Sequence, residues 1–159
     1  MKRLILLLTV FLLATVTYSQ SKIYDPSANA EKQIKEAVKD AQAKEKHVFV
    51  MIGGNWCPWC RKLHKFLSTQ EEVNKILEKN YVMVKVNYSK ENKNKEVLAD
   101  LGYPHRFGFP VLVILDENGE RLHTQSTVFL EEGKGYSKKT IKEFLNNWSP
   151  KALNPASYN

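Results

Sequence analysis

Residues 47–60 read HVFVMIGGNWCPWC, an apolar run followed by two glycines and by two cysteines three positions apart. The run at 47–52 is rich in β-branched and aromatic residues and does not alternate, which is typical of a strand buried on both faces. Gly53 and Gly54 end this strand, and a helix is expected at about 57–67. The two cysteines, Cys57 and Cys60, therefore open a helix that follows a buried strand.

The spacing of the two cysteines indicates chemistry rather than structural crosslinking. They are the only cysteines in the chain, and a disulfide between them closes only a tight turn, whereas a crosslink stabilises mainly by closing a long loop. The thiolate is the nucleophile in disulfide exchange, and the positive end of a helix dipole favours it at Cys57. Cys60, one turn later, can attack a mixed disulfide on Cys57. We expect a redox-active pair that needs no dissociable cofactor.

A cysteine pair of this spacing can also be half of a zinc site, and His64 follows Cys60 on the same expected helical face. Structural zinc usually takes four protein ligands, and the other histidines of the chain show no second paired spacing. A c-type haem requires a histidine directly after the second cysteine, where Arg61 stands. We therefore expect no metal and no bound cofactor.

Further helices and strands are expected on both sides of this segment. Asp25 and Pro26 look like an N-cap and a first-turn proline, and the apolar stripe that follows predicts a helix. Thr69 and Glu72 resemble a capping box that begins another helix. The remaining pattern predicts strands at 81–87, 111–115 and 120–124, a short helix at 94–101, a hairpin turn at 116–119 and a last helix capped by Ser137.

This order of elements indicates an α/β domain with one central mixed β-sheet flanked by helices. No internal repeat and no Pro/Gly/Ser-rich linker suggests a second domain. We expect a single domain over residues 20–159, with a short coil tail after residue 150.

The N-terminus has the three-part layout of a secretory signal. Basic residues 2–3 precede an apolar run at 4–14 and a polar, small-residue stretch at 15–20. A membrane anchor is the alternative, but a helix over that apolar run rises only ~16 Å, about half of a hydrocarbon core. Thr17 and Ser19 suit cleavage before Gln20. We expect a signal peptide at 1–19 and an exported protein that is soluble after cleavage.

Charge does not indicate a nucleic-acid site. The chain holds 24 Lys and Arg and 17 Asp and Glu, a net charge of +7, but the charge is spread along the sequence. Residues 90–95 mix Lys with Glu and Asn and carry no aromatic side chain, which is typical of a solvated face.

The motif NWCPWC at 55–60, after a buried strand, and GFPV at 108–111, before a later strand, together resemble the thioredoxin superfamily. The resemblance covers about residues 30–148 and implies a thioredoxin fold and a protein thiol–disulfide oxidoreductase. It implies that Cys57 is the exposed nucleophile, that Cys60 resolves, and that Pro110 is a cis proline. The expected substrate groove is lined by Trp56, Pro58, Trp59, Phe109 and Pro110.

Met51 departs from the family, because thioredoxins carry a buried acid at the matching position, whereas Lys85 matches the lysine that accompanies that acid. The segments WCPWCRKL, GFPVLVILD and LEEGKGY resemble exported bacterial thioredoxin-like proteins. They imply a periplasmic location, protein substrates with cysteines, a membrane or periplasmic redox partner for recycling, and a monomer. The alternative, which Met51 keeps open, is a thioredoxin-fold module that binds proteins while its disulfide stays inert.

Overall fold

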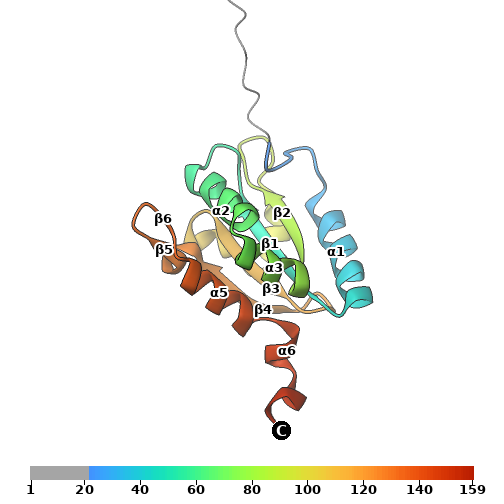
Figure 1. Cartoon of the computed structure of the whole chain (residues 1–159). Helices are drawn as coiled ribbons and strands as arrows, with labels where there is room; N and C mark the ends of the chain where they lie inside the picture. Colours follow the sequence, from blue (N-terminus) through green and yellow to red (C-terminus); the bar gives the residue numbers. More distant parts are fainter. Residues whose placement is uncertain (1–21) are drawn as a thin grey trace, which may run out of the picture.

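The computed structural model describes residues 22–159, so the expected signal peptide lies outside the described residues. A mixed sheet of four strands in the order β2-β1-β3-β4 forms the centre (Figure 1). β1 pairs parallel with β2 and antiparallel with β3, and β3 pairs antiparallel with β4. The strands are β1 (His47–Gly53), β2 (Tyr81–Asn87), β3 (Val111–Leu115) and β4 (Arg121–Ser126). The expected fold class, a mixed sheet flanked by helices, is confirmed.

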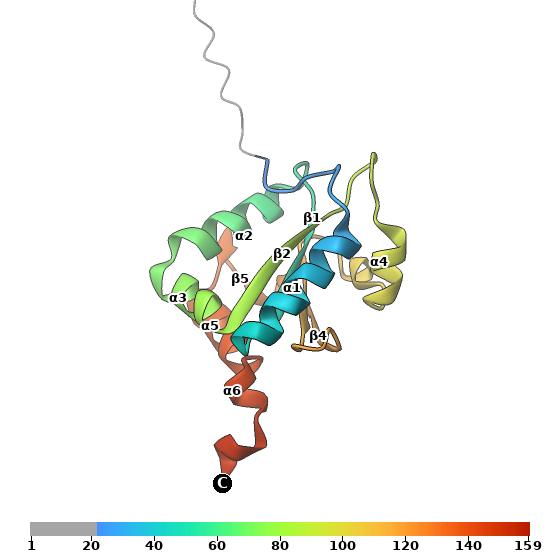
Figure 2. The same cartoon turned by 90° about the vertical axis from the view of Figure 1, so that its right-hand side faces the viewer.

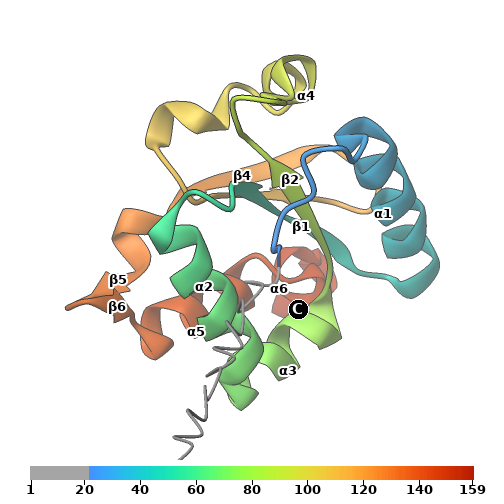
Figure 3. The same ribbon diagram turned by 90° about the horizontal axis from the view of Figure 1, so that it is seen from above.

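Helices cover both faces of this sheet. Seen from the side and from above, α1 and α4 lie on one face, and α2, α3 and α5 lie on the other (Figures 2 and 3). The helices are α1 (Ala30–Lys44), α2 (Pro58–Thr69), α3 (Glu71–Asn80), α4 (Lys95–Asp100), α5 (Lys138–Asn147) and α6 (Pro150–Leu153). Shorter elements are the 3₁₀ turns η1 (Pro104–Phe107), η2 (Thr127–Leu130) and η3 (Pro155–Tyr158), and the strands β5 (Glu131–Glu132) and β6 (Gly135–Tyr136).

β1 is buried along its whole length, as its non-alternating sequence predicts. Its residues alternate between two hydrophobic cores. Val48, Val50 and Ile52 pack on the side of α1 and α4, whereas Phe49 and Met51 join the core beneath α2, α3 and α5. Both cysteines belong to that second core. One face of the central strand therefore packs in the same hydrophobic core as the two cysteines.

The first helix begins later than expected. Asn29, not Asp25, is the N-cap of α1, and its side chain accepts a hydrogen bond of 2.8 Å from the backbone N–H of Lys32. The Asp25 carboxylate is already used by the backbone N–H and hydroxyl of Ser27. A short polar side chain that closes a tight turn of its own is not available to cap a helix.

The expected capping box at Thr69 is wrong. The Thr69 hydroxyl donates to the carbonyl of Lys65 inside α2, and α3 begins after Gln70 with no side-chain cap. Glu72 instead contacts Lys138 and Lys142 of α5. The expectation of a cap failed because both side chains have other partners.

The expected coil tail is also wrong, because α6 and η3 continue the chain beyond residue 150. Ser149 accepts a hydrogen bond from the backbone N–H of Ala152, and Pro150 takes the first helical position. A serine before a proline starts a helix here rather than ending one. Within residues 22–159, no helix combines the length and the apolar character needed to cross a membrane.

Candidate active site

A disulfide joins Cys57 and Cys60 at the beginning of α2, with 5.2 Å between their α-carbons. Cys57 is the N-cap, and its sulfur accepts a 3.1 Å hydrogen bond from the backbone N–H of Cys60. An N-cap oxygen usually takes this place and satisfies one of the free N–H groups of the first turn. The same N–H group and the positive end of α2 favour a negative charge on the Cys57 sulfur after reduction.

The two cysteines differ only slightly in exposure. Cys57 is 3% exposed and Cys60 is fully buried. The family resemblance implied that the nucleophile Cys57 is exposed. Cys57 is indeed the more accessible of the two cysteines, but its exposed fraction is smaller than expected. Trp56, its neighbour in the chain, is 55% exposed, and its indole N–H donates to the carbonyl of Tyr88. Trp56 therefore presents a fixed aromatic surface beside the disulfide.

The Phe109–Pro110 peptide bond is cis, as the resemblance implied. Val111 pairs with Ile52, so the loop before β3 and the loop after β1 lie at the same end of the sheet. The Phe109 ring packs edge-to-face with Trp56 at 5.7 Å between ring centres. The structure thus brings Trp56, Phe109 and Pro110 together, and their contact with substrate stays a prediction.

Tyr88 is part of the same aromatic cluster and was not identified from the sequence. Its ring lies 4.6 Å from that of Phe109 and 6.0 Å from that of His105. Nothing in the local pattern indicates this, because Tyr88 stands just after a strand, among polar residues. The tyrosine extends the aromatic surface from Trp56 toward η1.

Trp59 is not among the aromatic partners of this cluster. The Trp59 ring packs edge-to-face with Tyr136 of β6 at 5.5 Å, and the Lys62 ammonium lies 4.1 Å from its centre. Pro58 is exposed at the first position of α2. Of the five residues expected to line the groove, Trp59 therefore lies toward β6 rather than toward Phe109.

Basic side chains after the motif brace the neighbouring loops. The Arg61 guanidinium donates to the carbonyl of Asn55 at 2.7 Å, and the Lys62 ammonium donates to the carbonyl of Lys134.

Burial, and then the charge of Lys85, lowers the pKa of His64, so this imidazole is mainly neutral at pH 7. In the part of the chain described here, no three His, Cys, Asp or Glu side chains gather to hold a metal ion.

Asn55 ties the beginning of the described chain to the cysteine loop. Its side-chain oxygen accepts hydrogen bonds from the backbone N–H groups of Ile23 and Tyr24, at 2.9 and 3.1 Å. Its amide donates to the carbonyl of Tyr24 at 2.7 Å. The sequence pattern did not predict this contact, and its one signal was Tyr24, an aromatic residue among polar ones.

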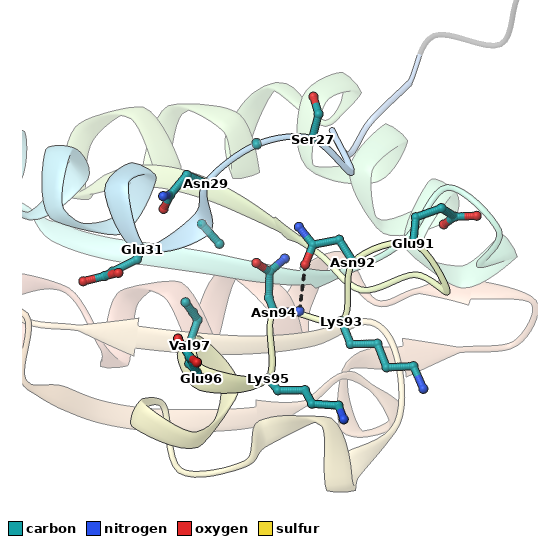
Figure 4. Close-up of a pocket in the computed structure, with 12 residues that line it drawn as sticks. Ser27, Asn29, Glu31, Glu91, Asn92, Lys93, Asn94, Lys95, Glu96 and Val97 are labelled. Atoms are coloured by element: carbon teal, nitrogen blue, oxygen red, sulfur yellow. Dashed lines mark hydrogen bonds between the residues drawn. The ribbon is translucent and has the colours of Figure 1, made fainter.

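A hollow of about 640 Å³ lies away from the disulfide, between the start of α1 and the loop before α4 (Figure 4). Several of its polar side chains form hydrogen bonds to the backbone of the segments that line the hollow. Asn92 donates to the carbonyl of Pro26 and accepts from the backbone N–H of Asn94, and Asn29 caps α1. No cysteine or histidine lines the hollow.

Comparison with known proteins agrees with this geometry. A family model described as thioredoxin-like matches residues 29–117. A disulphide isomerase from Xylella fastidiosa Temecula1 superposes with a TM-score of 0.70 at 27% identity, over 79% of this chain and 95% of that chain. A DsbH oxidoreductase superposes with a TM-score of 0.55 at 22% identity, over 70% of this chain and 78% of that chain. No curated protein matches the sequence.

Proposed function

Since the chain belongs to the thioredoxin-like family, we propose that it is a thiol–disulfide oxidoreductase that acts on protein substrates through Cys57 and Cys60. One observation carries this proposal: the disulfide opens α2, and the Cys57 sulfur accepts the hydrogen bond that a helix start offers. The likeness to a disulphide isomerase at 27% identity supports the same reaction class.

The reaction is reversible and involves only sulfur exchange. In the oxidising direction, a substrate thiolate attacks the Cys57 sulfur, the Cys57–Cys60 bond breaks, and Cys60 leaves with the electron pair. A second substrate thiolate then attacks the substrate sulfur of the mixed disulfide and releases Cys57 as a thiolate. The substrate gains a disulfide, and the protein gains two electrons and, at the pH of the solution, the matching protons. Reduction of a substrate is the same sequence reversed.

Apolar side chains around the cis-proline loop suit a protein substrate. Thr127 of η2 donates to the carbonyl of Pro110 at 2.7 Å, and the next two residues, Val128 and Phe129, are 63% and 75% exposed. Exposed apolar side chains therefore adjoin the cis-proline loop in two places, Trp56 against Phe109 and Val128 with Phe129 next to Thr127. Exposed apolar surface of this kind is typical of a binding site, and a cysteine-bearing segment of a partly unfolded protein fits it.

The cellular setting is also part of the proposal. The signal-like pattern at residues 1–19 supports export to the bacterial periplasm, where disulfides persist. There the protein acts as a soluble monomer and exchanges electrons with a membrane or periplasmic redox partner. Fractionation of cells that produce the full chain tests this directly, because retention in the cytoplasm would contradict it.

The proposed chemistry is tested with the purified protein and a disulfide-bonded protein substrate. We expect Cys57→Ser to abolish dithiol–disulfide exchange, and we expect Cys60→Ala to accumulate mixed disulfides with cellular proteins. Full exchange by Cys57→Ser would refute the proposal.

The alternative, a binding module with an inert disulfide, is favoured by the small exposed fraction of Cys57. It predicts that Cys60→Ala captures partners that detach in denaturant without reductant. The enzyme predicts partners that detach only when a reductant is added.

A further inference from the structure

Tyr24 carries a buried hydroxyl that the proposed reaction does not yet use. The residue is fully buried, and its hydroxyl oxygen has no hydrogen-bond partner in the described structure. Buried hydroxyl groups are normally hydrogen-bonded, because burial without a partner costs free energy. The tyrosine is also held in place, since Asn55 bonds both its backbone N–H and its carbonyl. An unpaired donor in such a fixed position requires an explanation.

The explanation lies beside Gly53, the last residue of β1. A β-carbon on this glycine would lie 2.5 Å from the Cys60 sulfur and 2.8 Å from the Tyr24 hydroxyl oxygen. The two atoms therefore border the same small space, which glycine keeps open. Tyr24 and Cys60 also belong to one hydrophobic core, together with the apolar Met51.

The redox state of Cys60 decides whether the Tyr24 hydroxyl has an acceptor. In the disulfide, the Cys60 sulfur is bonded to Cys57 and is a poor acceptor. After reduction it is a thiol or a thiolate, and a buried thiolate needs a donor far more than a disulfide does. Burial raises the pKa of Tyr24, so its hydroxyl keeps its proton and remains a donor.

We propose that Tyr24 is a positioning residue of the redox cycle: its hydroxyl donates a hydrogen bond to the Cys60 sulfur in the reduced protein and loses this bond when the disulfide forms. Tyr24 keeps its proton throughout, and no bond to it is made or broken. The hydrogen bond favours the reduced state of the pair. This inference rests on the proposed function in one respect, that the pair cycles between the two states.

The test replaces Tyr24 with phenylalanine, which removes only the hydroxyl oxygen. In glutathione buffers, the equilibrium constant between the dithiol and disulfide forms of the Cys57–Cys60 pair should shift about tenfold toward the disulfide. This shift corresponds to a reduction potential about 30 mV more negative than that of the wild type. Denaturant unfolding of the oxidised and the reduced protein provides a second, independent measurement of the same hydrogen bond. The oxidised variant should unfold at the same or a higher denaturant concentration than the wild type, whereas the reduced variant should unfold at a lower one.

Tyr81→Phe is the matched control. Tyr81 is also buried, but its hydroxyl donates to the carbonyl of Leu145 at 2.6 Å. Its loss should destabilise the oxidised and the reduced protein alike and leave the glutathione constant unchanged. A merely structural role for Tyr24 would give this same result.

An unchanged glutathione constant in Tyr24→Phe, with equal changes in the stability of both redox states, would overturn the inference. Failure of the wild-type pair to equilibrate with glutathione would instead refute the proposed function. The unfolding comparison would still decide the role of Tyr24 in that case, because it needs only chemically reduced and oxidised protein.

Discussion

Replacing Gly53 with alanine would place a methyl group between two atoms that have little freedom to move. The new carbon would lie 2.5 Å from the Cys60 sulfur and 2.8 Å from the Tyr24 hydroxyl oxygen, whereas favourable contacts between heavy atoms lie at about 3.5–4.0 Å. Cys60 is fixed by its disulfide, and Tyr24 is fixed by Asn55. Overpacking typically costs about 1–3 kcal/mol, and we expect the upper part of this range because both neighbours are tied.

Urea unfolding of the oxidised protein measures this cost. With a slope of roughly 2 kcal/mol per molar urea, a loss of about 3 kcal/mol lowers the midpoint by about 1.5 M. Gly135→Ala is the control, because nothing lies within 4 Å of a β-carbon at that position; we expect a change within about 0.5 kcal/mol. If Gly53→Ala matched this control, the packing described around Cys60 would be refuted.

Three other predictions concern the clamp that the Asn55 side chain forms on Ile23 and Tyr24, the ion pairs of Glu72, and the exposed Phe129. Asn55→Ala should cost about 1–3 kcal/mol in urea unfolding, because it removes the three hydrogen bonds to Ile23 and Tyr24; unchanged stability would show that the clamp contributes nothing. Hydrogen bonds from Lys138 and Lys142 lower the pKa of Glu72 to about 2, so its stabilising effect is complete above the unfolded value of about 4.3 and is lost as the pH falls through about 2. Glu72→Gln should therefore show a smaller drop in melting temperature between about pH 5 and pH 2, and an identical drop would contradict the pairing. Phe129→Ser should keep the melting temperature and glutathione exchange of the wild type but slow the turnover of a protein substrate, since Phe129 is 75% exposed; equal turnover would remove Phe129 from the substrate surface.

The strands were predicted almost to the residue, whereas two of the three expected N-caps, at Asp25 and Thr69, were wrong and the one at Ser137 was placed correctly. The runs at 81–87 and 111–115 match β2 and β3 in full, because burial of a strand leaves a continuous signature in its own sequence. A cap depends on which of several neighbouring polar side chains has no other partner. Asp25 and Thr69 were both occupied by local hydrogen bonds, which residue type alone does not reveal.

The same distinction applies to the site. Cys57, Cys60 and the cis Pro110 lie in short motifs, so the sequence was enough to locate them. The Tyr24–Asn55 contact joins positions 31 residues apart, and the hydrogen bond between Tyr136 and Trp59 spans 77 residues. Such contacts depend on how segments that are distant in the sequence pack together, and no periodicity or spacing encodes them.

The two ends of β1 suggest how this protein can be attached to a solid support. The start of the strand lies beside Trp148, whose carbonyl contacts the His47 ring at 2.8 Å, and α6 leaves from there (Figure 1). The disulfide follows the opposite end of the strand, after Gly53. A linker joined beyond α6 would therefore hold the protein on an electrode or a resin with its sulfur pair turned outward, open to incoming proteins.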